Sequence, residues 1–296
     1  MTLKESEYEL PDSWRKYLDE FLLQSKSSKS LIDFIGSSAP KSYFPRSDLV
    51  FNAFKFLPAG PEHVKVLIFG QDPYPRRDSA MGVAFYDGLV KRWSSPMSPS
   101  LRNIIKAVLR SRDLAEPSSK VAALRDTIYT HTSLPEPPEW FQKTSDQGVL
   151  WLNTALTFGG KDPEELKKHT TAWKPFIIHT IQTICKARKK IGKGFVCVLW
   201  GGIAKKTLMK TVEVEAKKIG CPVKFSISNH PAVDSFHKEE SCFTEITRLL
   251  HDLGESPVDF MCGGYKPLTP AKAVEKTGKR RTSGSILDLL SSPKKK

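Results

Sequence analysis

The sequence lacks the features that mark several protein classes. Its 296 residues contain no run of about 18 apolar residues, which excludes a membrane-spanning helix. The stretch from Met1 to Trp14 carries acidic residues and no apolar segment, so it resembles neither a secretory signal nor a mitochondrial presequence. We therefore expect an intracellular protein that does not associate with a membrane.

Cysteine and histidine are too scattered to form a recognisable metal or redox motif. The closest two of the five cysteines, Cys185 and Cys197, are twelve residues apart, so no C-x-x-C motif exists. An odd number of cysteines also argues against a disulfide framework. The seven histidines form no H-E-x-x-H pair. These absences predict a reduced protein that uses no metal and no cofactor.

Negative charge is in deficit, with 32 acidic residues against 46 basic ones and a formal net charge of +14. Such an excess predicts a polyanionic partner, nucleic acid first of all, although extra lysines also keep a protein soluble. Residues 266–296 hold nine basic and two acidic residues, which is half of the excess. The remaining chain is only mildly basic, and this favours one focused basic groove.

The composition divides the chain into three zones. Residues 1–9 are polar and predict a flexible N-terminus, residues 10–265 form one globular domain, and residues 266–296 form a basic tail that we expect to be disordered. Lys279–Arg281 and Pro293–Lys296 resemble nuclear-import signals or a phosphate-binding arm, and a merely solvated tail is an equal alternative. The tail could also bind a replication protein through a short apolar turn.

Short apolar runs separated by helical patterns indicate the fold. Four runs predict buried strands: Val64–Phe69, Val149–Leu152, Val196–Trp200 and Val223–Ser228. Three segments between or after them have helical periodicity: residues 100–110 with Ser100 as N-cap, residues 172–190 and residues 244–253. The alternation predicts a single α/β domain with a short parallel four-stranded sheet covered by helices on both faces. Residues 112–147 are Pro-rich, and we expect a surface insertion there.

Polar or glycine residues follow every predicted strand. These residues are Gly70–Tyr74, Asn153–Thr154, Gly201–Gly202 and Asn229–Pro231. The carboxyl ends of parallel strands share one edge of a sheet, where open α/β folds bind their ligands. The four strand ends therefore predict one common site.

Six strings carry a resemblance to a known family. GQDPYP, GVAFYDG, SPSLRNI, QGVLWLNTALT, VLWGGIAKK and NHPAVDS occur in the order and spacing typical of the family-1 uracil-DNA glycosylases, and the similarity spans residues 10–262. The resemblance implies a monomeric, monofunctional hydrolase that flips uracil out of single- or double-stranded DNA. It would cleave the N-glycosidic bond and leave an abasic site, which initiates base excision repair.

The resemblance also assigns roles to individual residues. Asp72 would stabilise the oxocarbenium-like sugar and orient water, and His230 would donate a hydrogen bond to the departing uracil. Asn153 would read the donor and acceptor edge of uracil. Tyr74 would exclude the methyl group of thymine, Phe85 would stack on the base, and Gln71 would add polarity to the pocket. The residues implied to grip the DNA backbone are Ser98, Pro99, Ser100, Gly201, Gly202, Pro231, Ala232 and Val233.

Several positions depart from the common family pattern. Pro75 stands where a histidine is usual, and Ala232 replaces a serine that contacts phosphate. The leucine that normally enters the duplex falls on Asp234, so Val233 or Phe236 is the candidate for that role. The D-P-Y-P and H-P-A strings resemble the poxvirus branch, whose members also act as processivity partners of a DNA polymerase. The alternative function is thus a replication accessory protein that retains the glycosylase fold.

Overall fold

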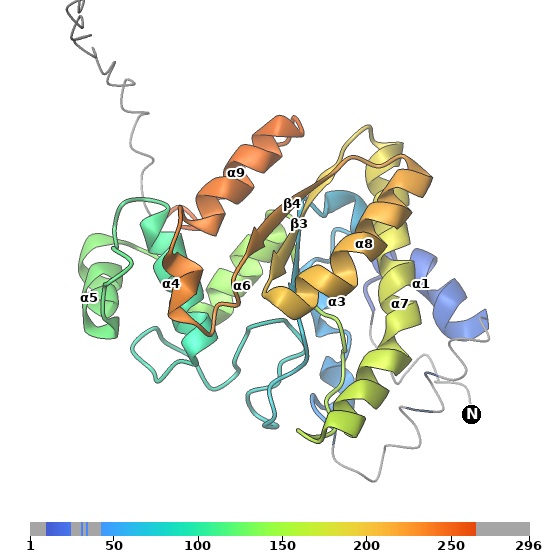
Figure 1. Cartoon of the computed structure of the whole chain (residues 1–296), viewed down its shortest axis with the longest axis horizontal. Coiled ribbons are helices and arrows are strands. Elements are labelled where there is room, and N and C mark those ends of the chain that lie inside the picture. The colour runs from blue at the N-terminus through green and yellow to red at the C-terminus, as the bar shows by residue number, and fades with distance from the viewer. Residues whose placement is uncertain (1–9, 25–30, 32–33, 35–42, 265–296) are drawn as a thin grey trace, which may run out of the picture. The chain divides into compact units, whose positions relative to one another are not determined.

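The computed structural model describes residues 10–24, 31, 34 and 43–264 (Figure 1). The predictions made for residues 1–9 and 266–296 lie outside the described residues. Within the described ranges, no helix is both long enough and apolar enough to cross a bilayer. None of the five cysteines, all of which lie in the described ranges, forms a disulfide bond.

The predicted parallel sheet is confirmed. Its strands are β1 (Val66–Gly70), β2 (Val149–Asn153), β3 (Phe195–Trp200) and β4 (Val223–Ser228), and they pair in parallel in the order β2-β1-β3-β4. Every residue of β1, β2 and β3 is buried, which is why these strands are continuous apolar runs. The edge strand β4 is half-exposed and reads V-K-F-S-I-S.

Helices cover both faces of the sheet, as expected (Figure 1). They are α1 (Asp12–Gln24), α3 (Asn52–Phe56), α4 (Pro99–Arg110), α5 (Val121–His131), α6 (Pro137–Asp146), α7 (Pro163–Lys190), α8 (Gly202–Ile219) and α9 (Cys242–Asp252), with 3-10 turns η2 (Ser47–Leu49), η3 (Pro61–His63) and η4 (Asp234–His237). Successive side chains of β1 point to opposite faces of the sheet, and each face packs against its own hydrophobic core. Leu67 packs in the core with α7 and α8, and Ile68 packs in the core with α4, α6 and α9.

The first turn of α4 differs from the prediction. The N-cap is Ser98, whose Oγ accepts a hydrogen bond from the Leu101 N–H at 3.2 Å, and Ser100 lies inside the helix. Pro99 occupies the first helical position, where a fixed φ and a missing N–H cost nothing. Two other helices extend beyond their predicted starts because Asp162 caps α7 and Ser241 caps α9.

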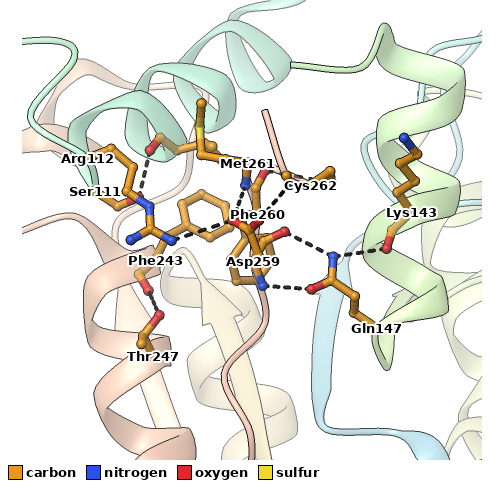
Figure 2. A network of polar contacts seen from close by, with 12 residues as sticks. Ser111, Arg112, Lys143, Gln147, Phe243, Thr247, Asp259, Phe260, Met261 and Cys262 are labelled. Carbon is orange, nitrogen blue, oxygen red and sulfur yellow. Dashed lines mark hydrogen bonds and ion pairs between the residues drawn. The ribbon is translucent and has the colours of Figure 1, made fainter. Parts of the chain in front are cut away.

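The expected surface insertion at residues 112–147 is wrong for its second half. This segment forms α5 and α6, and α6 packs on β2 through Trp140 and Phe141, both fully buried. Figure 2 shows how the chain after α9 is fastened to the end of α6: Gln147 Nε2 donates to the Asp259 carbonyl at 3.0 Å, and the Asp259 N–H donates to Gln147 Oε1 at 2.7 Å. Arg112 pairs with the Asp259 carboxylate at 3.5 Å.

Candidate active site

Three of the four strand ends converge on one cavity of about 270 Å³, and Gly201 and Gly202, which follow β3, line a different cavity. The first of these cavities lies at the carboxyl edge of the sheet, where the loops after β1, β2 and β4 meet. The structure brings together all six residues predicted for catalysis and base binding, and these lining residues are Gln71, Asp72, Tyr74, Phe85, Asn153 and His230. Ser100 and Pro75 also line the cavity.

Asp72 follows the central strand β1 and is partly buried. Burial raises the pKa of its carboxyl from 3.8 to about 6, because a low-dielectric environment disfavours the charged form. A hydrogen bond from its own backbone N–H lowers the pKa and only partly offsets burial. At neutral pH the group is therefore a poorly solvated carboxylate facing the cavity.

His230 lies in the loop after β4, and its hydrogen bonding fixes its tautomer. The Ala232 N–H donates to His230 Nδ1 at 3.1 Å. Nδ1 therefore acts as the acceptor, and in the neutral ring the proton is on Nε2. Burial lowers the pKa of His230, which favours this neutral form. The side chain offers the cavity a neutral N–H donor.

Asn153 ends β2 and pairs in register with Gly70 at the end of β1. Its side chain is only 3% exposed, and Oδ1 has no hydrogen-bond partner among the described residues. A Cβ on Gly70 would lie 2.2 Å from this oxygen, so only glycine leaves room for the amide. An unsatisfied buried acceptor is costly, and its position in the cavity indicates that a ligand supplies the donor.

Tyr74 and Phe85 form an ordered wall. The Tyr74 hydroxyl lies 3.0 Å from Ser98 Oγ and 3.3 Å from the Phe85 carbonyl, to which it donates. Burial raises the pKa of Tyr74 to about 12, so the hydroxyl stays protonated. Phe85 has a φ of 63°, a left-handed conformation that is uncommon for a bulky residue. Its ring packs 5.4 Å from that of Trp200.

The predicted backbone-gripping residues lie on three segments. Ser98, Pro99 and Ser100 begin α4, and Gly201 and Gly202 begin α8. Gly201 has a φ of 95°, and a Cβ there would lie 3.1 Å from His230 Cβ, so a side chain would press on the histidine.

The third of these segments follows His230. The Pro231 carbonyl accepts a hydrogen bond from Asn103 Nδ2 at 2.8 Å, which ties the loop to α4. Ala232 and Val233 are exposed, and Val233 is 47% exposed. Phe236 is wrong as a candidate for entering the duplex, because it is 6% exposed and packs edge-on against Trp200 at 5.4 Å.

Two features of the site have no local sequence signal. Thr154 Oγ1 donates to the Gln71 carbonyl at 2.8 Å, and the Ala155 N–H donates to the same oxygen at 3.0 Å. These bonds join the loop after β2 to the loop after β1. The segment after β2 is also joined to α7, because Trp173 Nε1 donates to Thr157 Oγ1, which lies 2.7 Å from His169 Nδ1. Nowhere in the described chain do three His, Cys, Asp or Glu side chains gather as a metal site.

Comparison with known proteins identifies the family of this chain. The family model of the uracil DNA glycosylase superfamily matches residues 57–254. The uracil-DNA glycosylase of Acinetobacter baumannii (strain SDF) is 34% identical over 205 residues, which are 69% of this chain and 73% of that protein. The uracil-DNA glycosylase of equine herpesvirus 1 (strain Ab4p) is 30% identical over 204 residues, 69% of this chain and 55% of the viral protein.

Solved structures share the fold. The wild-type UNG of Nitratifractor salsuginis has a TM-score of 0.62 and 28% identity, over 82% of this chain and 91% of that one. Mimivirus uracil-DNA glycosylase has a similar fold, with a TM-score of 0.61 and 20% identity over 85% of this chain and 87% of that one. The family match and the shared architecture together establish that this chain belongs to the uracil-DNA glycosylase superfamily.

Proposed function

We propose that the cavity receives a uracil flipped out of DNA and that the protein hydrolyses its N-glycosidic bond, leaving an abasic site. The observation that carries this proposal is the convergence of a carboxylate, a neutral imidazole and an unpartnered amide oxygen on one cavity of about 270 Å³. Membership of the superfamily supports the reaction class.

Recognition of the base follows from Asn153. Its Oδ1 accepts a hydrogen bond from uracil N3–H, and its Nδ2 donates to O4. Cytosine presents the reverse arrangement at these atoms and would leave buried polar groups unpaired, which selects against it. Phe85 offers a flat face for stacking, and Tyr74, held by Ser98, closes the space that the C5 methyl of thymine would need.

In the cleavage step, Asp72 acts on the sugar and His230 acts on the base. The C1′–N1 bond breaks with its electron pair moving to uracil, and the neutral His230 Nε2–H donates to O2 of the resulting anion. The Asp72 carboxylate stabilises the positive charge on the sugar and orients a water. The water oxygen bonds to C1′, and its proton passes to the carboxylate.

The DNA strand is held mainly by backbone groups. The amide N–H groups at the start of α4, near Ser100, and at the start of α8, near Gly202, suit phosphate oxygens. The loop of Pro231, Ala232 and Val233, in which Ala232 and Val233 are exposed and Pro231 is buried, lies against the duplex, and Val233 fills the space that the flipped base leaves.

A single experiment tests the activity. An oligonucleotide with one uracil is incubated with the protein without added metal, and alkali then cleaves any abasic site. We expect one cleavage at the uracil and none with thymine or cytosine in its place. Asp72→Asn should abolish the product, and full activity in this variant would contradict the assigned role.

The remaining expectations concern cellular context. The rival function, an accessory protein that only retains the fold, is disfavoured because such a protein needs no Asp72, His230 and Asn153 around one cavity. We further propose a monomer that enters the nucleus and contacts a replication protein through its basic tail, a segment outside the described residues. Localisation of a fluorescent fusion with and without residues 266–296 tests the nuclear part.

A further inference from the structure

A second cavity, of about 380 Å³, adjoins the proposed uracil pocket and is not used by the proposed reaction. It lies where the first half of α7 faces α8, two helices that pack side by side (Figure 1). Gln71 lines both cavities. Thr154, which directly follows Asn153, lines the larger one and donates to the Gln71 carbonyl.

The chemistry of this cavity is divided between an apolar floor and a polar rim. Ile177, Ile178 and Leu208 supply aliphatic surface, and Ile177 and Leu208 are buried. Hydroxyl groups stand around them, including those of Thr170 and Thr171. Thr170 Oγ1 donates to the Leu166 carbonyl, which leaves its oxygen free to accept a hydrogen bond.

The charge at this cavity is positive. Lys174 is exposed at the rim, and none of the described residues that line the cavity is acidic. No carboxylate of the described chain lies within ion-pair distance of Lys174. An unpaired ammonium beside an aliphatic floor and hydroxyl acceptors suits a ligand with one anionic group and one flat, partly polar ring.

We propose that this cavity binds the nucleotide next to the flipped uridine on the same strand, with its phosphate toward Lys174 and its base on Ile177 and Leu208. The inference rests on the proposed function, because it needs a DNA strand whose uridine occupies the neighbouring pocket. The strand continues from that pocket across Gln71, the residue that both cavities share. The cavity is the larger of the two and accepts either a purine or a pyrimidine, which suits a contact without sequence preference.

Steady-state excision from single-stranded pentanucleotides with a central uridine tests this inference. Lys174→Glu should raise KM by about tenfold with little change in kcat, and should lower the slope of log affinity against log salt by about 0.7, the value for one phosphate contact on a single strand. Lys186→Glu is the matched control, since Lys186 is exposed on the same helix far from the cavity. The KM of Lys186→Glu should stay within about twofold of the KM measured for a neutral substitution at position 186.

A second arm tests whether the base enters the cavity. The base on the 5′ or the 3′ side of uridine is replaced by an abasic tetrahydrofuran, and one of these substrates should lose about fivefold in kcat/KM with the unmodified protein. Thr171→Trp fills the cavity from its rim. In this variant the abasic and the complete substrates should have equal kcat/KM, because the substitution and the missing base remove the same contact. Thermal unfolding shows whether each variant is folded.

The outcomes separate the two proposals. Absence of uracil excision by the unmodified protein overturns the proposed function. Normal excision with equal KM values for Lys174→Glu and Lys186→Glu, and equal rates on all three substrates, overturns the neighbouring-nucleotide site alone.

Discussion

The side-chain oxygen of Asn153 lies over the α-carbon of Gly70, at a place that no Cβ on residue 70 could share. The two residues are register partners at the ends of β1 and β2, so the sheet itself sets their separation. The group proposed to read uracil is thereby positioned by a residue that has no side chain.

Gly70→Ala should therefore lower kcat/KM for uracil excision by about a hundredfold, because the amide must move by the order of 1 Å. A Cβ at this position would also lie 2.9 Å from Ala84 Cβ, which could destabilise the fold. The double variant Gly70→Ala/Ala84→Gly relieves that contact and should remain as inactive as the single variant. Recovery of activity in the double variant would show that Ala84, not Asn153, was displaced.

The pH dependence of kcat/KM should reflect Asp72. The reaction needs the carboxylate, whose pKa is about 6, so activity should fall about tenfold for each pH unit below 6 and level off above it. The lowered pKa of His230 means that this residue stays neutral over the plateau. His230→Ala should lose about a hundredfold or more in kcat at every pH. The inflection near pH 6 should persist in this variant, and its disappearance would reassign the titration to the histidine.

Replacing the ionisable side chain of Asp72 should raise the stability of the folded protein although it removes the activity. The pKa of this carboxyl is higher in the folded protein than in the unfolded chain, so the folded state loses stability as pH rises from about 4 to about 6. Asp72→Asn removes the ionisation and should raise the free energy of unfolding at pH 7.5 by about 1 kcal/mol, a value reduced for solvent screening. Denaturant titrations at pH 7.5 and 4 provide the measurement. The gain should vanish at pH 4, and a variant less stable at pH 7.5 would contradict the burial of the charge.

Val233 and Phe236 should respond differently to truncation. Val233→Ala should lower kcat/KM on double-stranded substrates by about fivefold and leave single-stranded substrates nearly unchanged, since only a duplex has a vacated space to fill. Phe236→Ala should instead lower the free energy of unfolding by about 3 kcal/mol, because it empties the space beside Trp200. Equal activity of Val233→Ala on both substrates would exclude Val233 from the duplex.

The strands were predictable because burial on both faces makes them uninterrupted apolar runs. The boundaries of helices were less predictable: Ser98 and Ser100 stand on either side of Pro99 and both satisfy the N-cap preference, and the structure uses Ser98. The insertion was misjudged because Trp140 and Phe141 stand among prolines and charges. Their burial depends on contact with β2, which lies outside any local pattern.

At the site, the residue types were predictable and their support was not. The strand ends and the family motifs identify Asp72, Asn153 and His230, and the structure places them around one cavity. The hydrogen bonds from Thr154 and Ala155 to Gln71 join segments more than 80 residues apart in the chain. Their partners become visible only once the sheet is assembled.

The half-exposed edge strand β4 has a consequence for thermal behaviour. His230 is delivered by β4, the strand at one border of the sheet, in which only Ser226 is buried. Border strands open locally at a lower free-energy cost than central ones. Heating should therefore detach His230, the proposed uracil hydrogen-bond donor, while the tryptophan-rich interior is still intact, so that inactivation precedes loss of near-ultraviolet ellipticity and reverses on cooling.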